Sequence, residues 1–428
     1  MYIPYDKIGQ TIALGFPKNS TRIIDFFNSI KVNANCKWIS KNKKNVLKKL
    51  KQKFNKTPLK VVFYVYENCR WKSQSLYDLM LNDKRFEPLI VVTKNCSKEG
   101  NANYQTIEDI KITYNFFKEK GMNVEYGYDI EKDEFIPFEK FNPDIVFYSH
   151  PWYVETSQGP VVCSKFALTY YIPYFLPNTS HYIEYDLRFH QYIHKYYVLN
   201  NLIKDFYHKK QTRKSNNMVS AGHTQLDYFY LNKPSVPTKR TVIYSPHWTI
   251  RGIDNIAYST FDWNGEAILE FAKSHPEIEW IFRPHPLLYK NLICTHFWSK
   301  EQTDNYYNEW KKIAKFSDCG NYLDIFNNSY AMITDCGSFL TEYLLSEKPV
   351  IHLVSQNAME YNDAVKKITK SYYQAHNLYE LNNYLKDVII NQNDYKKQDR
   401  INVLEELELR NNYCAANILK DIEGELNA

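Results

Sequence analysis

The feature that most constrains the fold is a stretch around residue 340 with the pattern of a strand, a helix and a second strand. Residues 331–334 (AMIT) are a short apolar run typical of a buried parallel strand, and residues 350–354 (VIHLV) are another. Apolar residues recur at helical spacing from Phe339 to Glu347, and Lys348-Pro349 ends this helix. The stretch therefore predicts a β-α-β unit of a parallel α/β sheet.

The turn that enters this helix consists of Asp335, Cys336, Gly337 and Ser338. Free backbone N–H groups and the helix dipole favour an anion such as phosphate at this position. An ordinary N-capped crossover helix would have the same pattern, so the turn alone does not establish a binding site.

Strand and helix patterns extend over most of the 428 residues, a length that suits two domains with extensions. Residues 59–65 and 144–148 predict strands of a first half, and residues 241–245 and 279–282 predict strands of a second half. The polar, basic segment 209–217 lies between the halves. Two consecutive α/β domains are therefore predicted.

Composition excludes several classes of protein. Hydrophobic residues make up 44% and charged residues 24%, which is ordinary for a soluble globular protein. The eight cysteines show no metal-binding spacing. No apolar run approaches the roughly 18 residues of a membrane span, and no signal-peptide pattern begins the chain. We therefore expect a cytoplasmic protein with reduced thiols.

The net charge of +6 is unevenly spread, because residues 41–56 contain eight lysines and no acid. Val46, Leu47, Leu50 and Phe54 recur at helical spacing within this segment. A basic amphipathic helix is predicted, which could lie on an anionic membrane surface with about 1 kcal/mol per well-placed lysine. A solvated helix preceding the first domain has the same pattern. Nucleic acid is not an expected partner, because no nucleic-acid-binding motif accompanies the charge.

Three predicted strands of the second half end in polar turns rich in donor groups. The turns contain Ser245-Pro246-His247, Arg283-Pro284-His285 and Thr334 to Ser338. The carboxyl ends of parallel strands lie at one edge of a sheet, so these turns could converge. An arginine fork, two histidines and a helix N-terminus together suit a pyrophosphate, although each histidine alone could be structural.

These motifs resemble the CDP-glycerol glycerophosphotransferase family of teichoic-acid and capsule polymerases. The similar segments are RPHPL at 283–287, the β-α-β stretch at 324–351, SPHW at 245–248 and GHTQLD at 222–227. The resemblance implies the GT-B fold, in which two Rossmann-like domains face a central cleft. The expected parts are an N-terminal extension with the basic helical segment (1–57), an acceptor domain (58–215), a nucleotide-donor domain (216–395) and a C-terminal helix (396–428).

The resemblance also implies roles for single residues. His285 would polarise the donor pyrophosphate as CMP leaves, with Arg283 beside it. Glu342 is similar to a ribose ligand, and its alternative is a solvent-facing helix carboxylate. The other residues expected around the donor are Ser245, His247, Thr334, Asp335, Gly337 and Ser338, of which His247 stands where the family has threonine.

The first half departs from the family pattern. The family carries a Trp-His-Gly-Thr-Pro motif whose histidine is the expected base, and the corresponding stretch 169–174 has no histidine. His150 is the candidate that could replace it, provided that it reaches the acceptor hydroxyl. Trp152 and Tyr153 could stack on an acceptor sugar. A structural role for the whole turn 149–153 is the alternative.

The leading hypothesis is a transferase that adds a glycerophosphate-type unit from CDP-glycerol, or a related CDP-linked alditol, to a cell-surface polysaccharide, teichoic-acid-like or lipid-linked acceptor. A GT-B glycosyltransferase using a nucleotide sugar in capsule or lipopolysaccharide synthesis is the second. An inactive nucleotide-binding scaffold and a nucleotide-sugar isomerase are further alternatives. No cofactor and no obligatory metal are expected, because no Asp-x-Asp pair ends a predicted strand.

Overall fold

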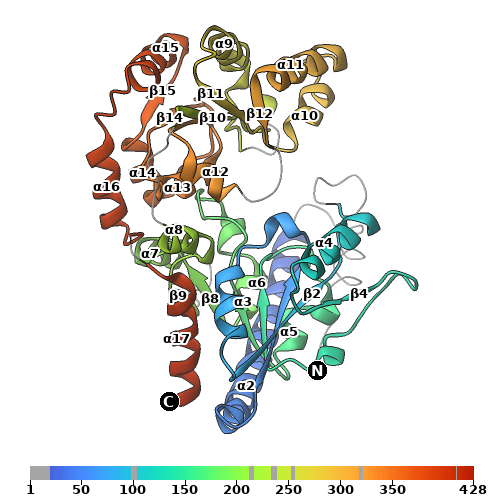
Figure 1. The fold of residues 1–428 in the computed structure, drawn as a ribbon. Coiled ribbons are helices and arrows are strands. Elements are labelled where there is room, and N and C mark those ends of the chain that lie inside the picture. The colour runs from blue at the N-terminus through green and yellow to red at the C-terminus, as the bar shows by residue number, and fades with distance from the viewer. Residues whose placement is uncertain are drawn as a thin grey trace.

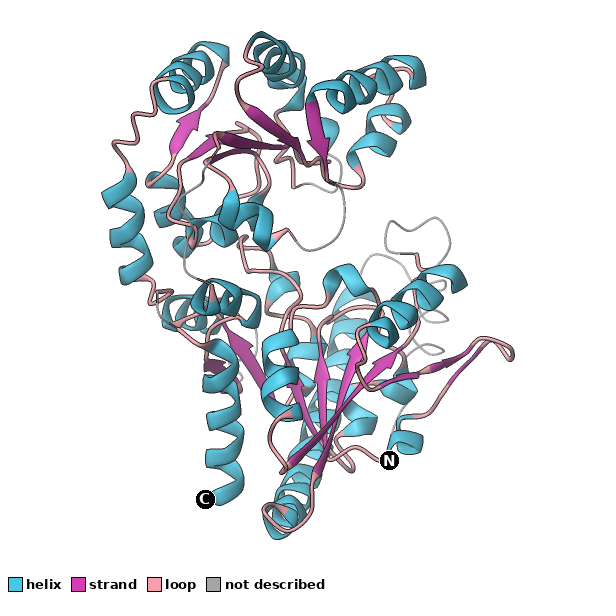
Figure 2. Cartoon of the chain, in the orientation of Figure 1, coloured by secondary structure: helices cyan, strands magenta, loops and turns pink. Residues whose placement is uncertain are grey.

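The computed structural model describes residues 20–97, 104–211, 216–232, 239–251, 256–317, 322–410 and 412–428. The first 19 residues of the predicted N-terminal extension lie outside this set, as do residues 212–215 of the predicted boundary segment. The chain forms two lobes, each built on a parallel sheet with helices against its faces (Figures 1 and 2). The predicted α/β fold with two Rossmann-like domains is confirmed.

The first sheet has seven parallel strands in the order β3-β2-β1-β6-β7-β8-β9. Runs of β-branched and aromatic residues form these strands, because helices bury both faces of the sheet. The strands are β1 (Leu59–Val65), β2 (Phe86–Val92), β3 (Val124–Tyr126), β6 (Ile145–Tyr148), β7 (Leu168–Tyr171), β8 (Lys195–Val198) and β9 (Met218–Ser220), and a small hairpin pairs β4 (Tyr128–Asp129) with β5 (Glu134–Phe135). β9 lies beyond the boundary predicted at residue 215 but pairs with β8, so the first domain extends one strand further than predicted.

The second sheet has six parallel strands in the order β12-β11-β10-β13-β14-β15. The predicted β-α-β unit is confirmed, with β13 next to β14 and α13 between them in the chain. The strands are β10 (Thr241–Ser245), β11 (Glu279–Phe282), β12 (Ala314–Phe316), β13 (Ala331–Thr334), β14 (Val350–Leu353) and β15 (Tyr373–Ala375).

Helices connect the strands in both domains. The first half contains α2 (Ser20–Lys53), α3 (Gln74–Leu81), α4 (Ile107–Glu119), α5 (Pro160–Cys163), α6 (Arg188–Tyr192) and α7 (Asn201–Lys210). The second contains α8 (Asp227–Leu231), α9 (Phe261–Ser274), α10 (Leu288–Cys294), α11 (Lys300–Ile313), α12 (Leu323–Asn328), α13 (Gly337–Leu344), α14 (Asp363–Lys370), α15 (Leu378–Tyr384), α16 (Lys397–Glu406) and α17 (Cys414–Asn427). Within the described ranges, no helix is both long enough and apolar enough to cross a membrane.

The basic segment belongs to α2, and its apolar stripe faces the protein. Val46, Leu50 and Phe54 are at most 4% exposed and join the hydrophobic core beneath the first sheet. The apolar face is therefore not available to a membrane, and only the lysine-bearing face remains on the surface. The predicted C-terminal helix is two helices, and α17 returns to the first domain, where Ile418 and Ile422 pack into the same core.

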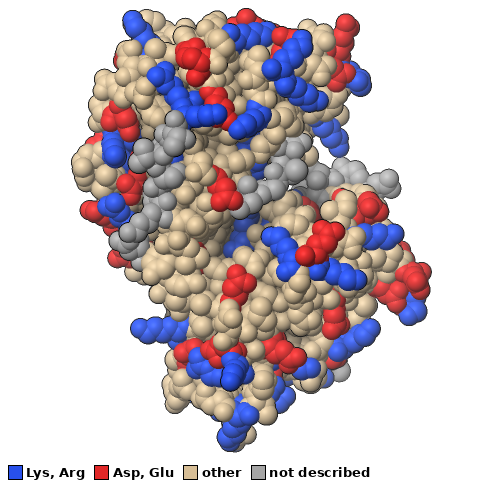
Figure 3. All heavy atoms as spheres, in the orientation of Figure 1, with Lys and Arg blue, Asp and Glu red and all other residues tan. Residues whose placement is uncertain are grey.

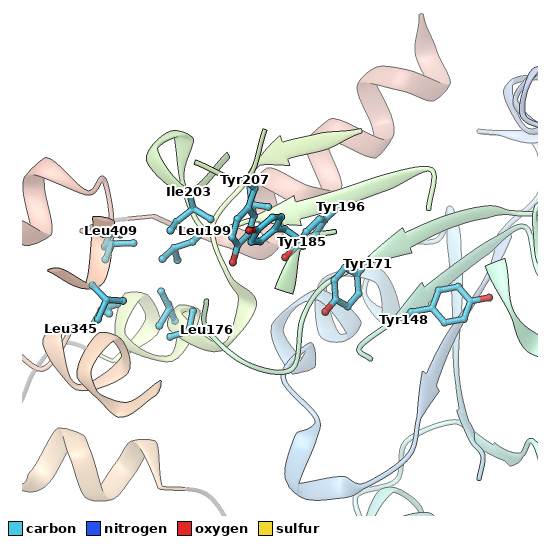
Figure 4. Packing of buried hydrophobic residues seen from close by; sticks show 14 of the residues in the cluster. Tyr148, Tyr171, Leu176, Tyr185, Tyr196, Leu199, Ile203, Tyr207, Leu345 and Leu409 are labelled. Atoms are coloured by element: carbon cyan, nitrogen blue, oxygen red, sulfur yellow. The ribbon is translucent and has the colours of Figure 1, made fainter. Parts of the chain in front are cut away.

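The two domains share hydrophobic packing. Figure 4 shows part of a cluster that runs from Tyr148 and Tyr171 of the first sheet to Leu345, which follows α13 of the second domain. Backbone contacts reinforce this interface: the Asn362 N–H donates to the Asn178 carbonyl at 3.1 Å. The strand ends of both domains are thus held across from each other.

Candidate active site

The three polar turns of the second domain lie together, as predicted. They follow β11, β10 and β13, which are neighbours in the sheet. The Ser245 hydroxyl donates to the Arg283 carbonyl at 2.7 Å, and the Thr334 hydroxyl donates to the Ser245 carbonyl at 2.7 Å. The His285 N–H donates to the Pro246 carbonyl at 3.1 Å. Side chains and backbone therefore bind the turns into one unit.

Asp335 is the central element of this unit. It is 1% exposed and accepts the His247 N–H at 2.6 Å, the Thr260 N–H at 2.7 Å and the Thr260 hydroxyl at 2.8 Å. Burial raises the pKa of its carboxyl to about 6, although these hydrogen bonds act to lower it. Asp335, Ser245 and Thr334 are predicted to contact the donor, but each is engaged within the protein. The carboxylate of Asp335 accepts hydrogen bonds from neighbouring segments, and the hydroxyls of Ser245 and Thr334 donate to carbonyls of neighbouring turns. They hold the site in shape.

The N-terminus of α13 is in close contact with the first domain. A Cβ atom at Gly337 would lie 2.7 Å from Nδ2 of Asn178 and 3.0 Å from Cε2 of Tyr258. Only glycine fits there without displacing a neighbour. The half-buried Ser338 follows it in the first turn of the helix. The predicted anion-binding turn is therefore bordered by a side chain from the opposite domain.

Two histidines of the second domain share one tautomer. Nδ1 of His285 accepts the Leu287 N–H at 3.1 Å, and Nδ1 of His247 accepts the Thr249 N–H at 3.4 Å. Both neutral rings therefore carry their proton on Nε2. Burial and the Arg70 charge lower the pKa of His285 to about 3, and burial lowers that of His247 well below its usual range. With ring centroids 5.6 Å apart, they form a pair of neutral N–H donors.

Arg283 and Glu342 lie in a charged cluster between the domains. Arg283 donates to the Ser317 hydroxyl at 2.6 Å, and its guanidinium lies 4.8 Å from the centre of the Tyr322 ring. Glu342 is 3% exposed and accepts from Nε2 of Gln225 at 2.7 Å, so it is not a solvent-facing helix carboxylate. Lys72 of the first domain donates to the Tyr322 hydroxyl at 3.2 Å. Burial raises the pKa of Glu342, and the Lys72 charge opposes this rise.

His150 lies on the first-domain side of the site. It is 3% exposed, and its ring stacks on that of Tyr174 with centroids 4.3 Å apart. Nε2 of His150 is 3.1 Å from Nη1 of Arg70, and Nδ1 is 2.9 Å from the Ser149 hydroxyl. Burial and the Arg70 charge lower its pKa well below the usual range. Both ring nitrogens are engaged, which argues against the predicted role as base.

Trp152 and Tyr153 line a separate cavity of the first domain. Its volume is about 680 Å³, and Phe189 and Tyr192 also border it. Trp152 stacks on Phe175 with ring centroids 5.9 Å apart, and Tyr153 is 37% exposed. The predicted contact of these two rings with an acceptor sugar stays a prediction.

The sequence interpretation missed Arg70, Lys72 and Asn178, which bring the first domain to the site. Arg70 and Lys72 follow β1, so they occupy the same kind of strand-end position that identified the second-domain turns. Figure 3 shows Lys and Arg atoms recessed in the hollow between the two lobes. In the described part of the chain, no group of three His, Cys, Asp or Glu side chains is arranged to hold a metal ion.

Comparison with known proteins shows which fold the chain has. No protein-family model matches the sequence, and no curated protein matches it. The structure of S. aureus MnaA with UDP has a TM-score of 0.54 at 12% identity, over 86% of this chain and 97% of that chain. The wall teichoic acid polymerase TagF has a TM-score of 0.54 at 12% identity, over 96% of this chain and 100% of that chain. The chain therefore has the GT-B fold.

Proposed function

We propose that the protein is a transferase that uses a nucleotide-activated donor. The observation that carries the proposal is the convergence of the turns at His247, His285 and Gly337 on one edge of the second sheet. The first-domain loop that carries Arg70 reaches this edge through the contact of Lys72 with Tyr322. These groups are N–H donors and a cation, while the buried Asp335 is turned inward. Such a set suits a diphosphate, whose negative charge must be stabilised as the leaving group departs.

The donor would bind as follows. Nε2–H of His247 and of His285 would donate to phosphate oxygens, and the backbone N–H groups of Gly337 and Ser338 at the start of α13 would donate to the same diphosphate. Arg283, held by Ser317 and the Tyr322 ring, would add a positive charge beside them. Catalysis would then depend on positioning and on charge stabilisation.

In its narrower form, the donor is CDP-glycerol. An acceptor hydroxyl would attack the β-phosphorus, the bond to the CMP oxygen would break, and the hydroxyl proton would pass to solvent or a base. The motifs at 222–351 that resemble the CDP-glycerol glycerophosphotransferase family support this donor. The GT-B fold shared with the wall teichoic acid polymerase TagF is consistent with it.

The test is to incubate the protein with CDP-glycerol or individual nucleotide sugars and an acceptor polymer, and to measure nucleotide release. CMP release from CDP-glycerol supports the narrower form. Nucleoside diphosphate release from a nucleotide sugar would replace it with sugar transfer. Because no metal is proposed to take part, EDTA should leave the rate unchanged. The increase in melting temperature with cytidine nucleotides, compared with that for uridine nucleotides, independently identifies the nucleobase of the donor.

One observation favours a second candidate, a nucleotide-binding scaffold. Both nitrogens of His150 are engaged, and the stretch that corresponds to the family's histidine motif has none. A protein that binds the donor without activating an acceptor would also lack a free histidine base at these positions. Donor binding without turnover on polysaccharide, teichoic-acid-like and lipid-linked acceptors would support the scaffold.

We also propose that the lysine face of α2 contacts an anionic membrane surface on the cytoplasmic side. Lys48, Lys49 and Lys51 are exposed, and the ion pairs among the described residues do not include them. Because the apolar stripe is buried, binding would be electrostatic and lost at high salt. Replacing all three by glutamine should weaken sedimentation with phosphatidylserine vesicles by up to about a hundredfold.

The matched control carries three lysine-to-glutamine changes on α4 and at the residue that follows it. Lys111, Lys118 and Lys120 are exposed on the same domain, so their replacement by glutamine removes an equal charge elsewhere. Equal loss of binding in both triple variants would mean that only net charge matters. Unchanged binding of the α2 variant would refute the contact.

A further inference from the structure

Arg70 is held in place from three directions. It ends a 3-10 turn (Asn68–Arg70) that follows β1, a central strand of the first sheet. Its Nε is 3.1 Å from a carboxylate oxygen of Glu67, its guanidinium lies 4.9 Å from the centre of the Tyr174 ring, and its Nη1 is 3.1 Å from Nε2 of His150. The side chain remains 22% exposed. An arginine fixed this firmly loses little conformational entropy on binding a ligand.

His150 is the part of this arrangement that determines where Arg70 points. A guanidinium is always protonated and can only donate, so Nε2 of His150 must be the acceptor. The ring proton is then on Nδ1, where it donates to the Ser149 hydroxyl at 2.9 Å. The ring itself is fixed by its stack on Tyr174 and by an edge contact with Tyr66, whose centroid is 5.0 Å away. Its only free lone pair is thus committed to Arg70.

The loop that carries Arg70 faces the second-domain turns. Two residues further on, Lys72 donates to the Tyr322 hydroxyl at 3.2 Å, and Arg283 lies over the same Tyr322 ring at 4.8 Å. The carbonyl of Lys72 accepts the Thr224 hydroxyl at 2.6 Å, which fixes the loop against the segment joining the domains. The Arg70 charge also contributes to the lowered pKa of His285 across the cleft. Through Lys72 and Tyr322, the loop that carries Arg70 thus adjoins the edge of the second sheet at which Arg283 and His285 lie.

We propose that Arg70 is a donor-binding residue supplied by the first domain and that His150 is the positioning residue that directs it toward the diphosphate. The inference rests on the proposed function, because it takes the donor to be a nucleoside-diphosphate compound. It replaces the base role of His150 with a binding role. The diphosphate site is then complete only when both domains contribute to it.

The experiment measures the affinity for CDP and UDP by calorimetry in the full-length protein. Arg70→Gln should raise the Kd of the nucleotide that the wild type prefers by roughly tenfold to a hundredfold, because a charge-assisted hydrogen bond is lost. His150→Ala should raise it by a smaller factor. His150→Gln should lie closer to the wild type, because its amide oxygen can accept the Arg70 N–H. Arg240→Gln is the matched control, since Arg240 precedes β10 at the opposite edge of the sheet.

The outcomes separate the inference from the proposed function. If the wild type binds neither CDP nor UDP, the proposed function and the inference both fail. If it binds one of them and Arg70→Gln binds equally well, only the inference fails. Thermal melting of each variant identifies loss of folding. Arg70→Lys is a second variant: it keeps the positive charge but loses the bidentate guanidinium, so it should bind the nucleotide more weakly than the wild type.

The pH profile separates positioning from base catalysis at His150. A positioning role predicts a higher KM in His150→Ala with the acidic limb of kcat unchanged. Loss of that limb, with KM unchanged, would show that His150 is the base and would overturn its assignment to Arg70.

Discussion

The histidines on the two sides of the cleft use their ring nitrogens in opposite ways. In the second domain, backbone N–H groups occupy Nδ1 of His247 and His285, so both rings present an Nε2–H donor. In the first domain, Arg70 occupies Nε2 of His150, and the ring presents no free nitrogen. The second domain therefore supplies neutral donors, whereas the first supplies a cation that a histidine holds.

The two sides are also stabilised differently. The second-domain turns are fixed by backbone hydrogen bonds to the buried carboxylate of Asp335. The first-domain side depends on ring stacking and on side-chain bonds around Arg70. One half of the site is therefore held by backbone groups, and the other is held by side-chain contacts.

His285→Ala should reduce turnover by about a hundredfold to a thousandfold, since it removes a donor aimed at the leaving group. His285→Gln should retain more activity, because its amide can donate from the position of Nε2. The pKa of about 3 keeps the ring neutral from pH 5 to 9, so His285→Gln should not shift the pH profile. Steady-state rates of nucleotide release between these pH values provide the measurement.

His285 is partly buried and follows a strand end, so the melting temperature of both His285 variants should stay close to that of the wild type. Nucleotide release that persists at the wild-type rate in His285→Ala would remove His285 from the mechanism. A pH profile displaced in His285→Gln would mean that the ring transfers a proton instead of donating a static hydrogen bond.

Asp335→Asn should lower the free energy of unfolding by about 2–3 kcal/mol. In either amide orientation, an N–H group of the new side chain faces a backbone N–H of His247 or Thr260, and that donor is left unsatisfied. The raised pKa of Asp335 means that the folded protein holds its proton more tightly than the unfolded chain. Stability from this group is therefore present below about pH 4 and lost as the pH rises through 6.

Urea unfolding at pH 5 and pH 7 checks both statements. The wild type should lose stability between these values partly through Asp335, and Asp335→Asn should lose less because it has no such group. Nucleotide affinity should fall in the variant, since the His247 turn loses its anchor. A variant as stable as the wild type would show that the second-domain turns do not depend on this carboxylate.

The sequence predicted the second-domain side better than the first, for physical reasons. Apolar strand runs and the rule that parallel strands end at one edge are local properties, so the β13–α13–β14 unit and the convergence of the three turns could be predicted. The hydrogen bond of Asp335 with Thr260 could not be predicted, because Thr260 is 75 residues away in the chain and only tertiary packing brings the two together. Arg70 was missed because ring stacking leaves no periodic pattern. The apolar stripe of α2 could be predicted, but the sequence does not determine whether a membrane or the protein core buries it. In the structure the protein core does so.

Glu184 is a buried carboxyl of the first domain, as Asp335 is of the second, and its replacement should have the smallest effect. It accepts the Thr179 hydroxyl at 2.6 Å, the Thr179 N–H at 3.1 Å and the Tyr207 hydroxyl at 2.8 Å. Burial raises its pKa to about 7, so its stabilising contribution is present below about pH 4.5 and lost as the pH rises through 7.

In Glu184→Gln the amide oxygen can keep both Thr179 donors, and the Tyr207 hydroxyl can turn to accept the amide N–H. We expect a loss below about 1 kcal/mol at pH 5 and no loss, or a gain, at pH 8, where the wild type must bury a charge. Urea unfolding at both values measures the difference. Both oxygens of Asp335 accept a backbone N–H, whereas one oxygen of Glu184 accepts the Tyr207 hydroxyl, which can reverse its hydrogen bond. A loss at pH 8 as large as that of Asp335→Asn would show that this hydroxyl does not reverse, and the two buried carboxylates would then be equally sensitive to an amide.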